Sequence, residues 1–192
     1  MGREYYYLIS TLPMVRRDAR PPMTSDEFLS RCATELSPAR LRDLASVSLV
    51  PGERAPSCDS ERRWLEWETY LRNCLVRYRG HRLETEIDAY LREEGNAFPA
   101  DRKLLEEGLN RGDPLTRERS IDALRWTVLD DLGAAHMFDF DALVVYRLRL
   151  LLADKASGSD EERGKSNLGD LVDAGVRQAE EHRTAGENQA VT

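Results

Sequence analysis

Apolar residues recur at helical spacing over most of the first 150 positions of the chain. The clearest run has steps of 3, 4, 3 and 4 residues, which place its members on one face of a helix. It comprises Trp64, Trp67, Leu71, Cys74 and Tyr78. After Gly80 the apolar positions resume in a shifted phase. We therefore predict a long central helix that is bent or broken near Gly80.

Capping residues mark where helices are expected to begin, because their side-chain oxygens accept hydrogen bonds from the first free backbone N–H groups. The signals are Thr24 or Ser25, Ser37 with Pro38, Asp59 or Ser60, Asp113 with Pro114, and Asp139 or Asp141. Gly133 is expected to end the helix that begins at Pro114, as a residue in the left-handed conformation. A shorter helix is expected over 101–109.

The segment from Tyr5 to Ile9 is aromatic and β-branched, which alone would favour a strand. No alternating strand pattern follows residue 12, so a strand here would have no partner. We expect either a helix imposed by packing or an extended segment laid on the core. The sequence therefore predicts an all-α fold, an irregular helical bundle around the long central helix.

The composition changes near residue 153. From Ala153 onward the chain carries 9 acidic and 5 basic residues among small polar ones, without a sustained apolar period. We predict a helical domain over 1–153 and a largely disordered acidic tail over 154–192. Within that tail, Gly164-Lys165-Ser166 is similar to the end of a phosphate-binding loop, but serine stands at 159 where the loop needs glycine. No nucleotide or other cofactor is expected.

The charge of the chain limits its partners. Its 192 residues have a formal net charge of −7, which argues against nucleic-acid binding because phosphates require a basic surface. No apolar run approaches the roughly 20 residues that span a bilayer, and the first residues lack the features of a signal peptide. The three cysteines include no C-x-x-C pair, so we expect free thiols in a cytoplasmic protein.

Acidic residues gather around one histidine late in the chain. Asp130, Asp131, His136, Asp139 and Asp141 could bind a divalent cation through oxygen ligands. Helix capping by Asp139 and Asp141 explains the cluster more simply, so we predict no metal site and keep a metal-dependent enzyme as a lesser alternative. No spacing typical of nucleophilic catalysis occurs, and the chain is interpreted as a protein without enzymatic activity.

Large side chains suggest a partner interface instead. Tyr5, Tyr6 and Tyr7 are consecutive, so they cannot all face one core; a partner surface and the core are equally plausible places for them. Trp64 with Arg72 nearby has the composition of an interface hot spot. The predicted interface is therefore Tyr5, Tyr6, Tyr7, Trp64 and Arg72.

Several blocks of the chain follow one another in an order that carries a resemblance. They are YYYLISTLP over 5–13, Pro22 with Phe28 and Cys32, Trp64 with Tyr70–Val76, Asp113-Pro114-Leu115 with Glu118 and 121–126, and FDFDAL over 138–143 with Tyr146 and Leu148. In this order they resemble a bacterial family of uncharacterised proteins that are encoded among V-type ATPase genes. That family is regarded as related to the socket subunit of V-type ATP synthases, designated C.

The resemblance implies an all-helical, non-catalytic subunit or accessory protein of a V/A-type rotary ATPase. In such enzymes the socket subunit holds the central stalk, which couples ATP hydrolysis to ion transport. The implied partners are the central shaft and the membrane ring, and the implied location is cytoplasmic, at the membrane through the complex but without a membrane span. A stand-alone helical adaptor that docks through the tyrosines is the alternative.

Overall fold

The structure is a computed structural model that describes residues 5–95 and 98–158, and within them it contains helices and no strand. The predicted all-α fold is confirmed. The helices are α1 (Tyr6–Thr11), α2 (Ser25–Cys32), α3 (Pro38–Ala45), α4 (Asp59–Leu83), the short 3₁₀ helix η1 (Asp88–Tyr90), α5 (Pro99–Leu109), α6 (Pro114–Ala134) and α7 (Phe140–Gly158). None of these helices has the length and apolar character needed to cross a bilayer.

The chain divides into two compact units after Asp154, and the fold described below is that of the first. The tail predicted over 154–192 lies almost wholly outside the described residues, and so does the Gly164-Lys165-Ser166 motif.

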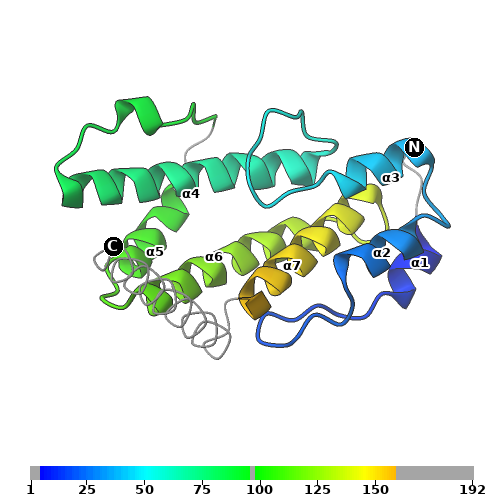
Figure 1. Cartoon of the computed structure of the whole chain (residues 1–192). Helices are drawn as coiled ribbons and strands as arrows, with labels where there is room; N and C mark the ends of the chain where they lie inside the picture. The colour runs from blue at the N-terminus through cyan, green and yellow to red at the C-terminus, as the bar shows by residue number, and fades with distance from the viewer. Residues whose placement is uncertain (1–4, 96–97, 159–192) are drawn as a thin grey trace, which may run out of the picture. The chain divides into compact units, whose positions relative to one another are not determined.

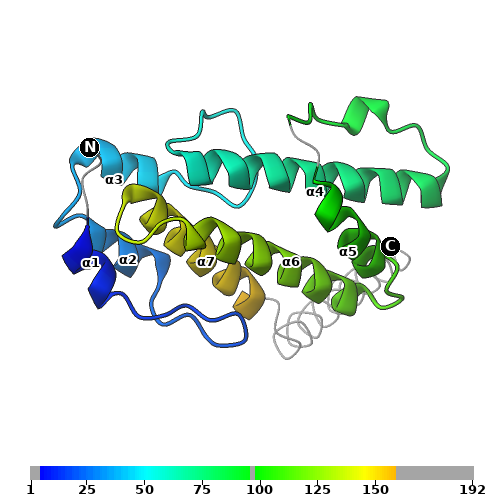
Figure 2. The ribbon, with the colours of Figure 1, turned by 180° about the vertical axis from the view of Figure 1, so that it is seen from behind.

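Three long helices, α4, α6 and α7, dominate the first unit (Figure 1). In both views α6 and α7 lie side by side, with α1, α2 and α3 near one end of the pair and α5 near the other (Figures 1 and 2). Each long helix supplies fully buried side chains to one core. The largest are Trp64 and Trp67 from α4, Leu129 from α6, and Leu143 and Leu148 from α7, joined by Phe28 from α2.

Four of the predicted helix starts are confirmed by hydrogen bonds to the capping side chain. Each cap accepts a bond from the backbone N–H three residues on, which satisfies a donor that the helix itself leaves free. The pairs are Thr24 with Glu27 at 3.2 Å, Ser37 with Arg40 at 3.4 Å, Asp113 with Thr116 at 2.7 Å and Asp139 with Ala142 at 3.0 Å.

The segment that could have been a strand is the helix α1. Leu8 on this helix is buried in the core, while the backbone N–H of Tyr5 donates to the carbonyl oxygen of Phe138 at 2.5 Å. Packing and this bond therefore decide in favour of the helical alternative.

Helix α4 runs unbroken from Asp59 to Leu83, so the predicted bend or break near Gly80 is wrong. The helix ends at Glu84, which has a left-handed backbone with φ 51°, and the chain then turns back along α4. This return brings Ile87 so close that a Cβ on Gly80 would lie 2.1 Å from Ile87 Cγ2. The shifted apolar phase thus marks a returning segment rather than a second half of the helix.

The close approach at Gly80 gives a first prediction. We expect Gly80→Ala to lower the free energy of unfolding by about 1–3 kcal/mol, because the new methyl group overlaps a stiff β-branched side chain. That cost outweighs the roughly 1 kcal/mol gained from better helix propensity. Urea unfolding of the purified chain measures the change.

The matched control is Gly52→Ala, since a Cβ there meets nothing within 4 Å. Its effect should stay within about 0.5 kcal/mol. Equal losses in the two variants would contradict the packing of Ile87 against Gly80.

Gly133 does not end α6 as predicted. The helix continues to Ala134, and no glycine in the described residues has a positive φ. A Cβ at Gly133 would lie 3.0 Å from Arg149 Nη2 and 3.4 Å from Val145 Cγ1, both on α7. The glycine therefore permits the close approach of α6 and α7.

Candidate protein-interaction surface

The three consecutive tyrosines face different surroundings. Successive residues of a helix point about 100° apart, so α1 cannot direct all three rings inward. Tyr5 is 7% exposed, whereas Tyr6 is 53% exposed and Tyr7 is 77% exposed. The ring of Tyr6 packs on that of Phe138, with the centroids 4.5 Å apart, so it is held in place while still facing solvent.

Two exposed methionines line a groove to which α1 contributes Ile9. Met14, in the segment after α1, is 75% exposed, and Met137, in the turn between α6 and α7, is 67% exposed. Both line a shallow groove of about 280 Å³ whose other walls include Ile9, Leu12, Val145 and Tyr146. We call Tyr6, Tyr7, Met14, Met137 and this groove the aromatic surface.

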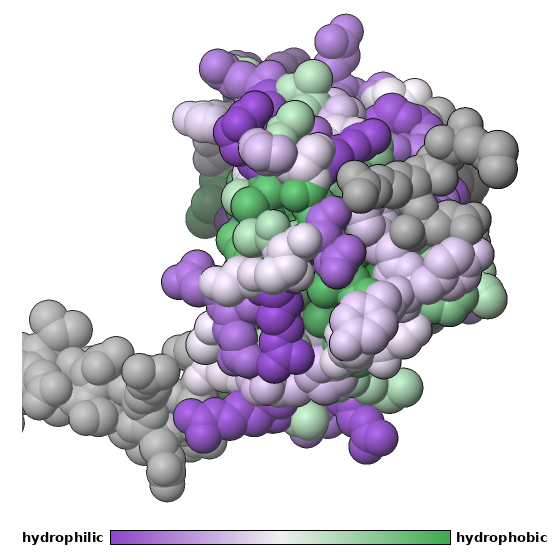
Figure 3. Space-filling model, turned by 90° about the vertical axis from the view of Figure 1, so that its right-hand side faces the viewer, coloured by the Kyte–Doolittle hydropathy of each residue, from purple (hydrophilic) through white to green (hydrophobic). Residues whose placement is uncertain are grey.

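Figure 3 faces the side on which α1, α2 and α3 lie in Figure 1. Apolar side chains reach the surface there between charged ones. Such mixed surfaces, with aromatic and methionine side chains inside a polar rim, are typical of protein–protein interfaces.

The structure places the other residues of the predicted interface elsewhere. Tyr5 is buried, and Trp64 is fully buried in the core beside Trp67, with ring centroids 5.8 Å apart. Arg72 lies on α4, where its Nε is 3.1 Å from Glu68 Oε1. Of the predicted residues, Tyr6 and Tyr7 are therefore the two that are exposed on α1.

The sequence reasoning missed the two methionines of that surface. A weak signal existed, because both Met14 and Met137 interrupt segments that otherwise read as connections between helices. The contact of α1 with the α6–α7 turn determines which exposed residues lie near one another. The local sequence pattern does not show that contact.

The predicted acidic cluster is partly brought together at the α6–α7 turn. His136, Asp139 and Asp141 offer ligand atoms that all lie within 4.8 Å of one another. Asp130 instead pairs with Arg149 at 2.8 Å, and Asp131 is exposed on α6. Three of the five candidate ligands therefore converge.

The convergent groups have structural partners. His136 Nδ1 lies 2.6 Å from Asp139 Oδ2, and the other oxygen of Asp139 caps α7. Asp141 Oδ1 accepts a hydrogen bond from the backbone N–H of Ser60 at 2.8 Å, at the start of α4. Together these contacts tie the α6–α7 turn to the first turn of α4.

Burial raises the pKa of the Cys58 thiol to about 12, and the nearby Asp141 carboxylate raises it further. Burial likewise raises the pKa of Cys32 to about 12 and raises that of Cys74. A thiol with a raised pKa stays protonated at neutral pH and is a poor nucleophile. The arrangement therefore favours a structural role for all three cysteines.

Asp141 gives a prediction of pH dependence. Burial alone would raise the pKa of its carboxyl, but hydrogen bonds from Ser60 and Cys58 and the nearby His136 outweigh burial and lower it. A carboxyl whose folded pKa lies below the unfolded value stabilises the fold above that unfolded value, about 3.9, and loses this effect as pH falls through the folded pKa.

We expect Asp141→Asn to cost about 1 kcal/mol at neutral pH, the typical effect of a weakened helix cap. The variant should also lose less stability than the natural chain as pH falls from about 5 to 2. Urea unfolding at several pH values measures both effects, with the exposed Asp131→Asn as the control. An unchanged acid slope in Asp141→Asn would contradict this account.

Comparison with known families gives one match. Residues 95–178 match a family described as a protein of unknown function (DUF2764). The matched residues include α5, α6 and the turn that carries Met137. No curated protein and no solved structure matches the chain.

Proposed function

We propose that the chain is a non-catalytic helical subunit or accessory protein of a V/A-type rotary ATPase. It binds other ATPase subunits through the aromatic surface. The observation that carries the proposal is the exposure of Tyr6 and Tyr7 on α1, the helix whose Ile9 lines the groove that Met14 and Met137 also line. The ordered sequence blocks, which resemble the family related to the ATPase socket subunit, support the choice of complex.

The aromatic surface has the physical properties of a docking site. Tyrosine offers a large contact area with only two rotatable side-chain bonds, so little conformational entropy is lost on binding. Methionine adapts to the shape of the facing surface. The packing of Tyr6 on Phe138 fixes part of the site before the partner arrives, which lowers the cost of binding.

The proposed mechanism is mechanical, and no bond is made or broken. The chain joins subunits by burying apolar side chains between rigid helices. Its partners in this proposal are the central shaft and the membrane ring, so the chain lies at the membrane through the complex.

A stand-alone helical adaptor would use the same aromatic surface. Copurification from the source cells separates the two functions. The full chain should bring down central-shaft and ring subunits of the ATPase in stoichiometric amounts. Recovery of one unrelated protein, without those subunits, would favour the adaptor and contradict the ATPase proposal.

A further inference from the structure

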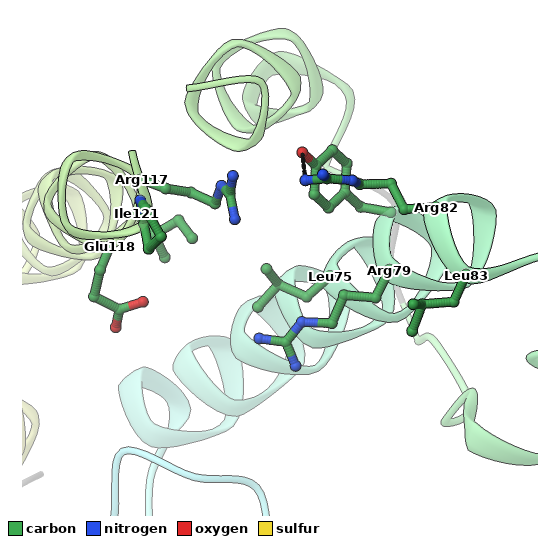
Figure 4. Close-up of a pocket in the computed structure, with 9 residues that line it drawn as sticks. Leu75, Arg79, Arg82, Leu83, Arg117, Glu118 and Ile121 are labelled. Carbon is green, nitrogen blue, oxygen red and sulfur yellow. Dashed lines mark hydrogen bonds between the residues drawn. The ribbon is translucent and has the colours of Figure 1, made fainter. Parts of the chain in front are cut away.

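A second groove, far from α1 in sequence, lies between the C-terminal half of α4 and the start of α6. Its volume is about 460 Å³, and its apolar lining includes Leu75, Leu83, Pro114 and Ile121. Figure 4 shows Leu75 and Ile121 facing each other from the two helices. Leu83 is among the most exposed large apolar residues of the described chain.

Three arginines surround this apolar floor: Arg79 and Arg82 from α4 and Arg117 from α6. Among the described residues, none of the three forms an ion pair with a carboxylate. Glu118 also lines the groove, but its carboxylate lies 3.8 Å from Arg125 Nη1.

Arg82 Nη1 donates to the Tyr78 hydroxyl at 3.3 Å, and the guanidinium carbon of Arg117 lies 5.6 Å from the centroid of the same ring. Arg117 Nη2 also donates to the carbonyl oxygen of Arg111 at 2.9 Å. Tyr78 thus contacts two guanidinium groups that pair with no carboxylate in the described part of the chain.

The adjacent groove between α4 and α5 does not have such unpaired arginines among its described residues. Tyr78 also lines a groove of about 510 Å³ between α4 and α5. There Arg77 pairs with Glu94 at 2.9 Å, and Arg102 pairs with Glu106 at 2.9 Å. The arginines of the α4–α5 groove are therefore paired with carboxylates. Within the described residues those of the α4–α6 groove are not, since its carboxylate, Glu118, pairs with Arg125.

We infer that the α4–α6 groove binds an acidic amphipathic segment of a partner protein. An aliphatic side chain of that segment packs on Leu75 and Ile121, and its carboxylates pair with the arginines. Figure 4 shows Arg79 extending on one side of Leu75, with Arg82 and Arg117 on the other. Carboxylates on successive turns of a helix would face the arginines on both sides.

The inference goes beyond the ATPase proposal and does not depend on it. An acidic partner is chosen for its charge complementarity, because the groove has three arginines on a chain whose net charge is −7. Complementary charge across an interface also speeds association and disfavours partners of like charge.

A designed peptide tests the inference on the full chain. The probe is a fluorescein-labelled peptide of about 15 residues, long enough to form a helix, with leucine at every third or fourth position and glutamate between. Fluorescence anisotropy should show saturable binding. Arg79→Gln/Arg82→Gln should weaken it at least about tenfold, the effect of losing charge-assisted hydrogen bonds. The control Arg42→Gln/Arg63→Gln removes two exposed arginines outside the groove and should bind as the natural chain does.

Two altered peptides test separately the carboxylates and the leucines of the probe. Glutamine in place of glutamate should abolish binding, and serine in place of leucine should weaken it strongly. Equal binding of the serine peptide would overturn the inference, because it would leave only charge attraction. Unchanged urea unfolding of Arg79→Gln/Arg82→Gln confirms that the variant is folded; both side chains are exposed at the end of α4.

Competing anions give the remaining outcomes. Tripolyphosphate and phosphatidylglycerol vesicles should bind weakly and in the same way to both arginine variants. Tight binding of either anion that requires Arg79 and Arg82, with no binding of the acidic peptide, would overturn the inference in favour of a phosphate or membrane site.

Discussion

Replacing Glu68 with glutamine is expected to lower the free energy of unfolding by about 3–5 kcal/mol, the cost of removing one partner from a buried ion pair. Glu68 on α4 is almost fully buried and accepts two hydrogen bonds from Arg125 on α6, at 3.0 and 2.9 Å. Burial alone would lower the pKa of Arg125, but Glu68 and then Asp122 raise it above its usual value. Arg125 therefore stays charged, and without Glu68 it would lose its fully buried partner and keep Asp122, 2.7 Å away and only partly buried.

The size of this effect depends on burial, so an exposed pair is the control. Glu106 accepts a hydrogen bond from Arg102 Nε at 2.9 Å on the exposed surface of α5. Glu106→Gln should cost less than about 1 kcal/mol. Urea unfolding measures both variants, and similar costs would contradict the buried position of Glu68.

A double variant separates the charge from the packing. Glu68→Met with Arg125→Met removes both charges and leaves apolar side chains in their place. Its loss of stability should be smaller than that of Glu68→Gln, because both of the most buried charges are removed and the Asp122 carboxylate that loses Arg125 is partly exposed. A double variant less stable than the single one would show that the ion pair itself is indispensable.

Replacing Tyr5 with alanine should also cost about 3–5 kcal/mol, as expected when a buried aromatic ring is removed. Tyr7, two positions later and within α1, should tolerate alanine within about 0.5 kcal/mol because its ring faces solvent. Thermal or urea unfolding of the two variants measures the difference. A large loss for Tyr7→Ala would place its ring in the core and remove it from the aromatic surface.

Local signals were enough to predict most helix starts. Ser37 before Pro38 and Asp113 before Pro114 act through bonds to residues only three positions away, so the sequence itself contains the interaction. The spacing of Trp64 and Trp67 likewise identified the buried face of α4.

The wrong predictions concern contacts between distant segments. Gly80 and Gly133 were interpreted as interruptions of helices, but each lies within a helix and admits a close neighbour, Ile87 in one case and Arg149 in the other. The sequence alone does not distinguish a glycine that ends a helix from one that admits a close neighbour, because the neighbour comes from a distant segment. The α4–α6 groove is similar, because Arg82 and Arg117 meet at Tyr78 only when the two helices pack.

The aromatic surface was predictable only in part. The sequence shows that Tyr5, Tyr6 and Tyr7 cannot all be buried, but the choice among them depends on how α1 is rotated against Phe138. The contribution of Met137 depends on the same contact. The sequence therefore indicated the segment, and the packing of α1 decides which of its side chains face solvent.

The central claim is that the aromatic surface binds ATPase subunits. The most direct test measures the affinity of the purified full chain for the isolated central-shaft and ring subunits, by surface plasmon resonance. Tyr6→Ala/Tyr7→Ala should weaken binding by about 100-fold or more, as for two hot-spot aromatics. Tyr90→Ala, which removes an exposed tyrosine on η1, should leave it unchanged. Binding that is equally strong in all three proteins, or absent from the natural chain, would contradict the account.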